Sequence, residues 1–257
     1  MAGRSARAPR PREDGVTVSA DVAVFCVASP LHYLAACRVA ERFEAGAQRI
    51  LVAYKPDVVQ FVDRAQWDAV VETPWPRLWP LPGPFGRHRR LLDNVRRVVR
   101  ACEPRARGGR VHLHAPVFDT EATNYLLAAM KTQAGAREVR ARLLPDGLLN
   151  LARYPLSAAR RLAQHARRLR ALVSPALSYT TFAGDRTGSD APFVDRIYVL
   201  SGLPCPYPSG RVTVLPSLLP AASRVSGAGS DAHPAAGTGA RRALVVGQPL
   251  TGARRMS

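Results

Sequence analysis

Short apolar runs alternate with amphipathic stretches along most of this chain. The first apolar run, residues 21–28, is continuous, as is typical of a parallel strand that is buried on both faces. It ends at Ser29-Pro30, after which apolar residues recur at helical spacing through residues 31–43. Residues 49–54 form a second apolar run. Strand, helix and strand in close succession predict a βαβ unit with a right-handed crossover.

The same alternation continues to residue 215 and predicts a doubly wound α/β fold around a parallel sheet. Residues 73–86 are crowded with Pro and Trp and are predicted to form a loop. The predicted strands cover residues 21–28, 49–54, 69–72, 110–114, 137–144, 195–200 and 211–215. The predicted helices cover residues 31–43, 58–64, 87–102, 121–131 and 156–173.

Composition divides the chain into four parts. Residues 1–20 are rich in Arg and Pro, and we expect them to form a disordered basic tail, whereas residues 21–220 carry the α/β pattern of one domain. Residues 221–240 are mostly Ala, Ser and Gly, which is typical of a linker. Residues 241–257 begin with a new apolar run and are too few for a helix and a returning strand. We therefore expect them to be the first strand of a truncated second α/β domain.

Positive charge is the most unusual feature of the composition. The formal net charge is +18, and arginine carries nearly all of it, because Lys55 and Lys131 are the only lysines. A basic surface attracts phosphate groups, so the candidate partners are nucleotide-sugars, anionic lipids and nucleic acid.

Arginines concentrate in residues 87–110 and 153–170. These stretches are interpreted either as solvated helix faces or as surfaces that dock on anionic lipid head groups. Nucleic acid is the less favoured partner, because the few aromatic residues lie apart from the arginines, whereas a single-strand binder usually interleaves the two.

Cysteine spacing and the absence of several motifs narrow the classes of protein. The four cysteines form no CxxC pair, and Cys26 lies in the first predicted strand, where we expect an inert core thiol. The N-terminal residues lack the apolar segment of a secretory signal, and the apolar runs are shorter than the ~20 residues of a membrane span. We expect a cytoplasmic protein whose membrane contact, if any, is peripheral and on the inner membrane. GxSxG, P-loop and GxGxxG sequences do not occur, so the sequence gives no support to the enzyme classes that these motifs mark.

Ligands of open α/β sheets bind outside the carboxyl ends of the strands, and the loop after the first strand is one candidate. It carries Ser29, His32 and Tyr33, and a helix N-terminus there would offer free N–H groups to an anion. Ser29 also fits an N-cap, with Pro30 at the first helical position, and the two interpretations are compatible.

Two further loops carry candidate chemistry. Asp146-Gly147 follows the fifth predicted strand, where the carboxylate suits a general base, although an Asp-Gly pair is also a common plain turn. Gly247-Gln248 follows the last apolar run, where the amide could bind a sugar or a base and the glycine permits close backbone approach.

A metal site is the weaker interpretation of the histidines. His112 and His114 alternate on one face of a predicted strand, but no third ligand stands at a convincing spacing. We therefore predict no metal ligands and interpret the pair as structural or facing the cleft.

Several segments, in matching order along the chain, resemble bacterial sialyltransferase-like and polysialyltransferase-like glycosyltransferases of the family 52 group and its relatives. Residues 24–34 resemble the opening strand and loop of these enzymes, and Asp146-Gly147 with Asn150 and Tyr154 resembles their acidic-glycine motif. Residues 184–199 resemble the stretch between these motifs, and residues 244–250 resemble the strand that opens their second domain.

The resemblance implies a GT-B fold of two Rossmann-like halves, with residues 21–220 as the acceptor-side half and the donor-binding half largely missing. It implies an inverting, metal-independent transfer without a cofactor, often of sialic acid from CMP-sialic acid, to a cell-surface glycan of capsule or lipooligosaccharide. By match to the motif, Asp146 would be the catalytic base. The residues expected to bind substrate are Ser29, His32, Tyr33, Gly147, Gly247 and Gln248.

The chain departs from the family pattern in two places. The motif commonly has a second acidic residue where this chain has Pro145, and the expected His-Pro motif would lie beyond residue 250. His233-Pro234 falls in the predicted linker and is interpreted as coincidence. Whether the truncated chain is active therefore stays open, and a basic nonenzymatic protein that binds nucleic acid or a membrane surface is the alternative.

Overall fold

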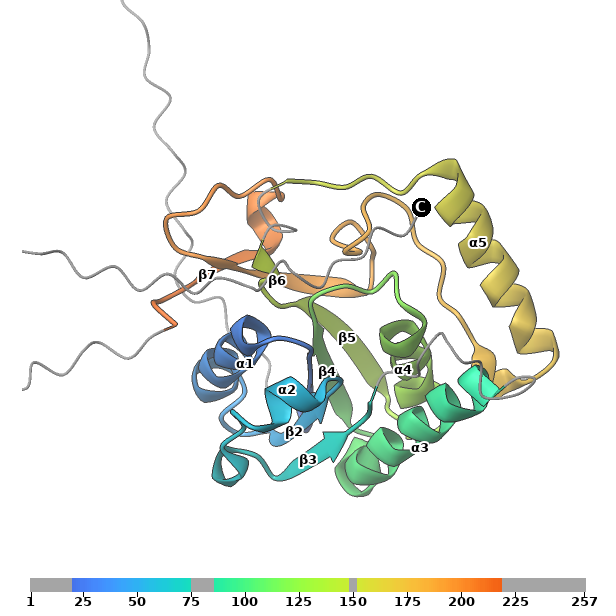
Figure 1. Ribbon diagram of the computed structural model, residues 1–257, viewed down its shortest axis with the longest axis horizontal. Coiled ribbons are helices and arrows are strands. Elements are labelled where there is room, and N and C mark those ends of the chain that lie inside the picture. The colour runs from blue at the N-terminus through green and yellow to red at the C-terminus, as the bar shows by residue number, and fades with distance from the viewer. Residues whose placement is uncertain (1–19, 75–85, 148–151, 219–257) are drawn as a thin grey trace, which may run out of the picture. The chain divides into compact units, whose positions relative to one another are not determined.

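The computed structural model describes residues 20–74, 86–147 and 152–218, which all belong to one compact unit, Met1–Ala221 (Figure 1). The predicted basic tail lies outside the described residues except for Ala20. The predicted linker, the strand of the second domain and most of the Trp-containing loop also lie outside them.

A single sheet of seven parallel strands forms the centre of the described structure, in the order β3-β2-β1-β4-β5-β6-β7. Every strand predicted between residues 21 and 215 is present, with bounds shifted by at most one residue. The strands are β1 Val22–Val27, β2 Gln48–Ala53, β3 Ala69–Glu72, β4 Arg110–Ala115, β5 Glu138–Leu143, β6 Val194–Leu200 and β7 Val212–Leu215.

Helices connect the strands and cover both faces of the sheet, which confirms the doubly wound α/β fold (Figure 1). Side chains of β1 alternate between two apolar cores. Ala23 and Phe25 pack with α1 and α2, whereas Val24 and Cys26 pack with α3 and α4. The helices are α1 Pro30–Phe43, α2 Pro56–Val59, α3 Gly86–Ala106, α4 Glu121–Thr132 and α5 Ala158–Leu169, with short 3-10 turns at η1 Arg64–Gln66, η3 Arg170–Leu172, η4 Pro175–Leu177 and η5 Ser209–Arg211.

Strand order reverses between β1 and β4. The chain builds β1, β2 and β3 outward in one direction, and then returns to the free edge of β1 to add β4 and the later strands. In open α/β sheets this reversal opens a crevice at the carboxyl edge, where ligands bind. The predicted site loops after β1 and β5 lie at this edge, on either side of the end of β4.

Two helices differ from the prediction in length. The predicted helix 58–64 is a single turn, α2, followed by the separate turn η1, because Asp63 is extended and its carboxylate accepts the amide of Ala65. The predicted helix 156–173 is α-helical only to Leu169 and continues as η3. None of the helices in the described part of the chain has the length and apolar character needed to cross a membrane.

Candidate functional site

The loop after β1 is shaped by a helix cap. Ser29 is extended, with φ −150° and ψ 160°, and its hydroxyl oxygen accepts the backbone N–H of His32 at 3.3 Å. Pro30 begins α1, where its missing N–H costs nothing. The capping role of Ser29 is therefore confirmed, and its contact with substrate stays a prediction.

His32 and Asp146 form a pair at the carboxyl edge of the sheet. The Nε2 atom of His32 lies 2.8 Å from Oδ1 of Asp146, although 114 residues separate them. On the other side of the ring, Nδ1 accepts the backbone N–H of Ala28 at 3.3 Å. Because Nδ1 accepts, a neutral ring carries its proton on Nε2 and donates it to Asp146.

The side chains of His32 and Asp146 differ in how far they are exposed to solvent. The side chain of His32 is only 6% exposed, and both of its nitrogens are engaged, whereas the Asp146 side chain is 30% exposed. A ligand at this edge can therefore reach the carboxylate but not the ring nitrogens. His32 holds and orients the carboxylate, and Asp146 is the group that can react.

Gly147 allows the chain to turn directly after Asp146. Its φ of +44° lies in the left-handed region, which favours glycine. A Cβ atom built on Gly147 would meet only the side chain of Leu31, at 3.9 Å, so the loops after β5 and β1 lie against each other. The Asp-Gly turn and the general base are thus compatible interpretations of the same two residues.

The side chain of Tyr33 makes contacts that stabilise the fold. Its hydroxyl oxygen accepts the backbone N–H of Asp63 at 2.9 Å, and its ring is buried close to Trp67. Burial also raises the pKa of the Tyr33 hydroxyl. The geometry explains Tyr33 as a link between α1 and the segment before η1, and its predicted contact with substrate gains no support. Gly247 and Gln248 lie outside the described residues.

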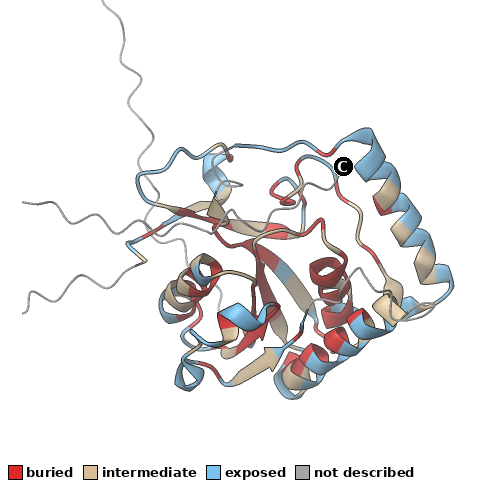
Figure 2. Ribbon diagram, in the orientation of Figure 1, coloured by how far each residue is buried: buried red, intermediate tan, exposed pale blue. Residues whose placement is uncertain are grey.

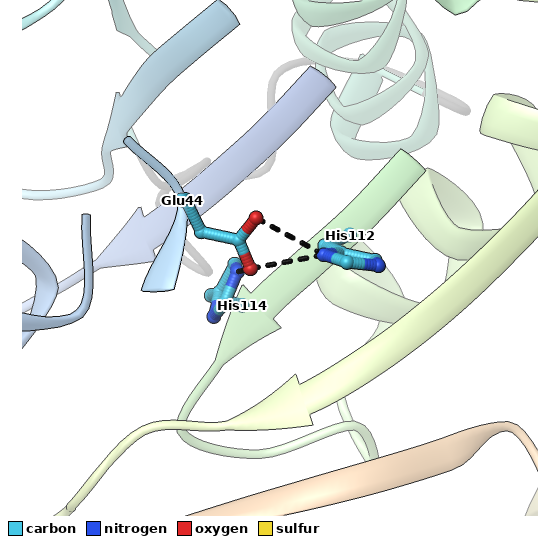
Figure 3. A group of neighbouring side chains, drawn as sticks. All are labelled: Glu44, His112 and His114. Atoms are coloured by element: carbon cyan, nitrogen blue, oxygen red, sulfur yellow. Dashed lines mark hydrogen bonds and ion pairs between the residues drawn. The ribbon is translucent and has the colours of Figure 1, made fainter. Parts of the chain in front are cut away.

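A cluster of polar side chains lies inside the protein, on the face of the sheet that α1 covers. Figure 3 shows His112 and His114 of β4 turned toward Glu44, which caps the C-terminus of α1. Nδ1 of His112 lies 2.9 Å from Oε1 of Glu44, and Nε2 of His114 lies 3.3 Å from the same oxygen. The prediction that both histidines share one face is confirmed, but the sequence did not indicate Glu44 as their partner.

Arg142 completes this buried cluster. Its Nη1 donates to Glu44, its Nη2 lies 3.3 Å from Nε2 of His112, and its Nε donates to Asp195 at 3.1 Å. Since a guanidinium can only donate, Nε2 of His112 accepts and Nδ1 donates to Glu44. His112 is therefore explained as a neutral bridge between Arg142 and Glu44.

Burial and neighbours set the ionisation of the cluster. Burial alone would raise the pKa of Glu44, but the hydrogen bond from His112 and the nearby imidazole of His114 outweigh it and hold this pKa well below its usual range. Burial lowers the pKa of His114 to about 4, against the attraction of Glu44. At neutral pH Glu44 is therefore a carboxylate, Arg142 a guanidinium and His114 a neutral imidazole.

The three groups Glu44, His112 and His114 lie within 4.8 Å of one another, as metal ligands would. The guanidinium of Arg142 already occupies Oε1 of Glu44, and its positive charge would repel a cation at that point. These contacts fit a buried ion pair better than a metal centre. The absence of metal ligands stays a prediction.

The second arginine-rich stretch is only partly a solvated face. Arg160 of α5 donates to Asp119 at 2.9 Å, and Arg170 donates to Glu121 at 2.8 Å. Arg167 also lies within 3.3 Å of Glu121. These arginines bind α5 to the start of α4, which leaves fewer of them for nucleic acid or lipid.

Fold and site together define an α/β protein with a Rossmann-like doubly wound parallel sheet and a histidine–carboxylate pair at its carboxyl edge. A scan against protein-family models found no matching family, and searches of curated proteins and of solved structures found no match. The resemblance to sialyltransferase-like enzymes therefore stays a prediction from the sequence.

Proposed function

We propose that this chain is the acceptor-side part of an inverting, metal-independent glycosyltransferase of the sialyltransferase-like kind, with Asp146 as its catalytic base. The observation that carries the proposal is the contact between His32 and Asp146. These two residues come from two separately predicted site loops, and they meet beside the reversal of strand order, where ligands bind in such sheets.

The chemistry follows from Oδ2 of Asp146, which has no hydrogen-bond partner among the residues that the structure describes. An acceptor hydroxyl that binds this oxygen can pass it a proton as the hydroxyl oxygen attacks the anomeric carbon of the donor sugar. The bond from that carbon to the phosphate oxygen breaks, and the nucleotide leaves with the bonding electrons. His32 keeps the carboxylate in place during transfer. The resemblance favours CMP-sialic acid as donor and a cell-surface glycan as acceptor.

A transfer assay with CMP-sialic acid and glycan acceptors tests the role of Asp146. We expect the Asp146→Asn variant to lose transfer by about 10²- to 10⁴-fold, the usual contribution of a general base. Asp93→Asn is the matched control, because Asp93 is an exposed carboxylate on α3 that pairs with Arg96 of the same helix. Equal rates for wild type and Asp146→Asn would contradict the assignment.

Acceptor binding gives a second readout that does not need the donor-binding half. A glycan that occupies the site should perturb the ring resonances of His32 in NMR spectra, with saturation, and should leave those of the exposed His165 unchanged. If no nucleotide-sugar is consumed and no glycan perturbs His32, the glycosyltransferase proposal is wrong.

A further inference from the structure

Helix α5 turns a polar face toward the protein. Arg160, Gln164 and Arg167, at helical spacing i, i+4 and i+7, lie on this inner face. Gln164 is buried and donates to Asp119 at 3.0 Å, where Arg160 also binds. Hydrogen bonds and ion pairs, rather than an apolar core, therefore hold the helix.

The outer face of α5 is apolar. Leu162 and Leu169 are 71% and 64% exposed, and Leu172 and Val173, which follow in the next turn, are 85% and 87% exposed. Most of the ribbon of α5 is coloured as exposed (Figure 2). A surface helix normally buries such a stripe, whereas α5 leaves it in solvent. Single exposed apolar residues are ordinary, but a contiguous stripe indicates a binding surface.

Two arginines border the stripe. Arg161 and Arg168 are exposed and seven residues apart, so they lie in one row along the helix. Among the residues that the structure describes, neither is joined to an acidic group by an ion pair. The outer surface of α5 thus combines an exposed apolar stripe with two arginines that have no acidic partner among the described residues.

We propose that α5 and η3 form a docking surface for an anionic membrane. Leu162, Leu169, Leu172 and Val173 would enter the boundary between head groups and acyl chains, while Arg161 and Arg168 bind lipid phosphates. Charge favours this occupant over a second copy of the chain, because the net charge of +18 makes the chain repel itself and attracts anionic lipid. This inference is independent of the proposed glycosyltransferase activity.

Vesicle flotation tests the surface, with full-length protein and two kinds of vesicle: phosphatidylcholine alone, and phosphatidylcholine mixed with phosphatidylglycerol. We expect the protein to float with the mixed vesicles and to remain unbound with the neutral ones. The double variant Leu162→Gln, Leu169→Gln should lower binding by at least about tenfold, because the apolar stripe is lost. Both side chains are exposed, so the variant should keep the circular dichroism spectrum of the wild type. Leu203→Gln, at another exposed leucine, is the matched control.

The role of Arg161 and Arg168 is tested by comparing two double variants. Arg161→Gln with Arg168→Gln should reduce binding to the mixed vesicles by about tenfold. Arg105→Gln with Arg137→Gln makes the same change in net charge at exposed positions elsewhere, and should reduce binding much less.

Several outcomes would overturn the proposal. The proposal is wrong if the wild-type protein does not float with the mixed vesicles. It is also wrong if the leucine double variant binds these vesicles as strongly as the wild type does. A concentration-dependent dimer in analytical ultracentrifugation that the leucine variant abolishes would assign the stripe to a second copy instead.

Discussion

Replacing His114 with phenylalanine probes how the buried cluster responds to pH. The ring of His114 is fully buried, and it stacks on Phe25 with a centroid distance of 4.3 Å and on Tyr198 at 5.9 Å. Charged or titratable groups also face it from other elements: Glu44 at the end of α1, and Arg142 of β5. Phenylalanine keeps the aromatic stacking and removes the proton-binding nitrogens.

The expected change in the free energy of unfolding with pH follows from the pKa of His114. Burial lowers its pKa from 6.5 to about 4 in the folded protein. Between these values the unfolded chain binds the proton and the folded protein does not, so the free energy of unfolding falls as the pH falls from about 6.5 to about 4. At about 1.4 kcal/mol per tenfold change in proton affinity, the loss from this residue is about 3 kcal/mol.

Urea unfolding at a series of pH values, followed by tryptophan fluorescence, measures this loss. Trp67 is buried with its ring centroid 5.2 Å from that of Phe25, so its emission reports on the same core. We expect the wild type to lose about 3 kcal/mol more than His114→Phe between pH 6.5 and pH 4. His165→Gln, at an exposed histidine of α5, should retain the wild-type pH dependence. Equal pH dependence in wild type and His114→Phe would refute the reasoning.

Three further predictions concern other buried or capping groups. Glu44→Gln should lower the free energy of unfolding by about 3 kcal/mol, because it removes one of the two counter-charges of the buried Arg142 and leaves only Asp195. Adding Arg142→Met should recover part of this loss in the same urea assay. Ser29→Ala should cost about 1 kcal/mol through the lost helix cap, as measured by thermal or urea unfolding. Burial raises the pKa of the Cys26 thiol to about 12, so alkylation of the native protein should label the exposed Cys205 and spare Cys26, as read by mass spectrometry.

Strands were the most predictable feature of this protein, for a physical reason. A central parallel strand is buried on both faces, so it appears in the sequence as a continuous apolar run, and β1 is buried at all six positions. Such runs are visible without knowledge of their neighbours. The sequence therefore predicted the sheet, although the pairing order had to come from the structure.

The buried face of α1 shows what a periodic pattern misses. Apolar spacing pointed to Leu31 and Leu34, which are only partly buried, whereas His32 and Tyr33 are buried. Burial of these two polar side chains depends on partners elsewhere in the chain, Asp146 for the ring and the amide of Asp63 for the hydroxyl. No local pattern contains those partners. The sequence indicated the site loops but not that they touch.

The buried cluster left a weak signal in the sequence. Glu138, Arg140 and Arg142 alternate along β5 with apolar residues, which is unusual for a strand inside a doubly covered sheet. The alternation predicts one polar face, and a charge buried there needs a partner. Helix α5 gives a similar signal, because arginines without acidic residues of their own must pair with acids outside the helix or remain in solvent.

The reversal of strand order also governs how the domain can form during synthesis. β1 leaves the ribosome early, yet its second neighbour, β4, is made only after α1, β2, β3 and α3. Arg110, the first residue of β4, follows Val22, the first residue of β1, by about 88 residues, a delay of about 4–18 s at the usual ~5–20 residues per second. Throughout that interval one edge of an apolar strand has no partner from its own chain, and such edges pair readily with other chains. The centre of the finished sheet is therefore exposed to aggregation in the nascent chain, until β4 covers it.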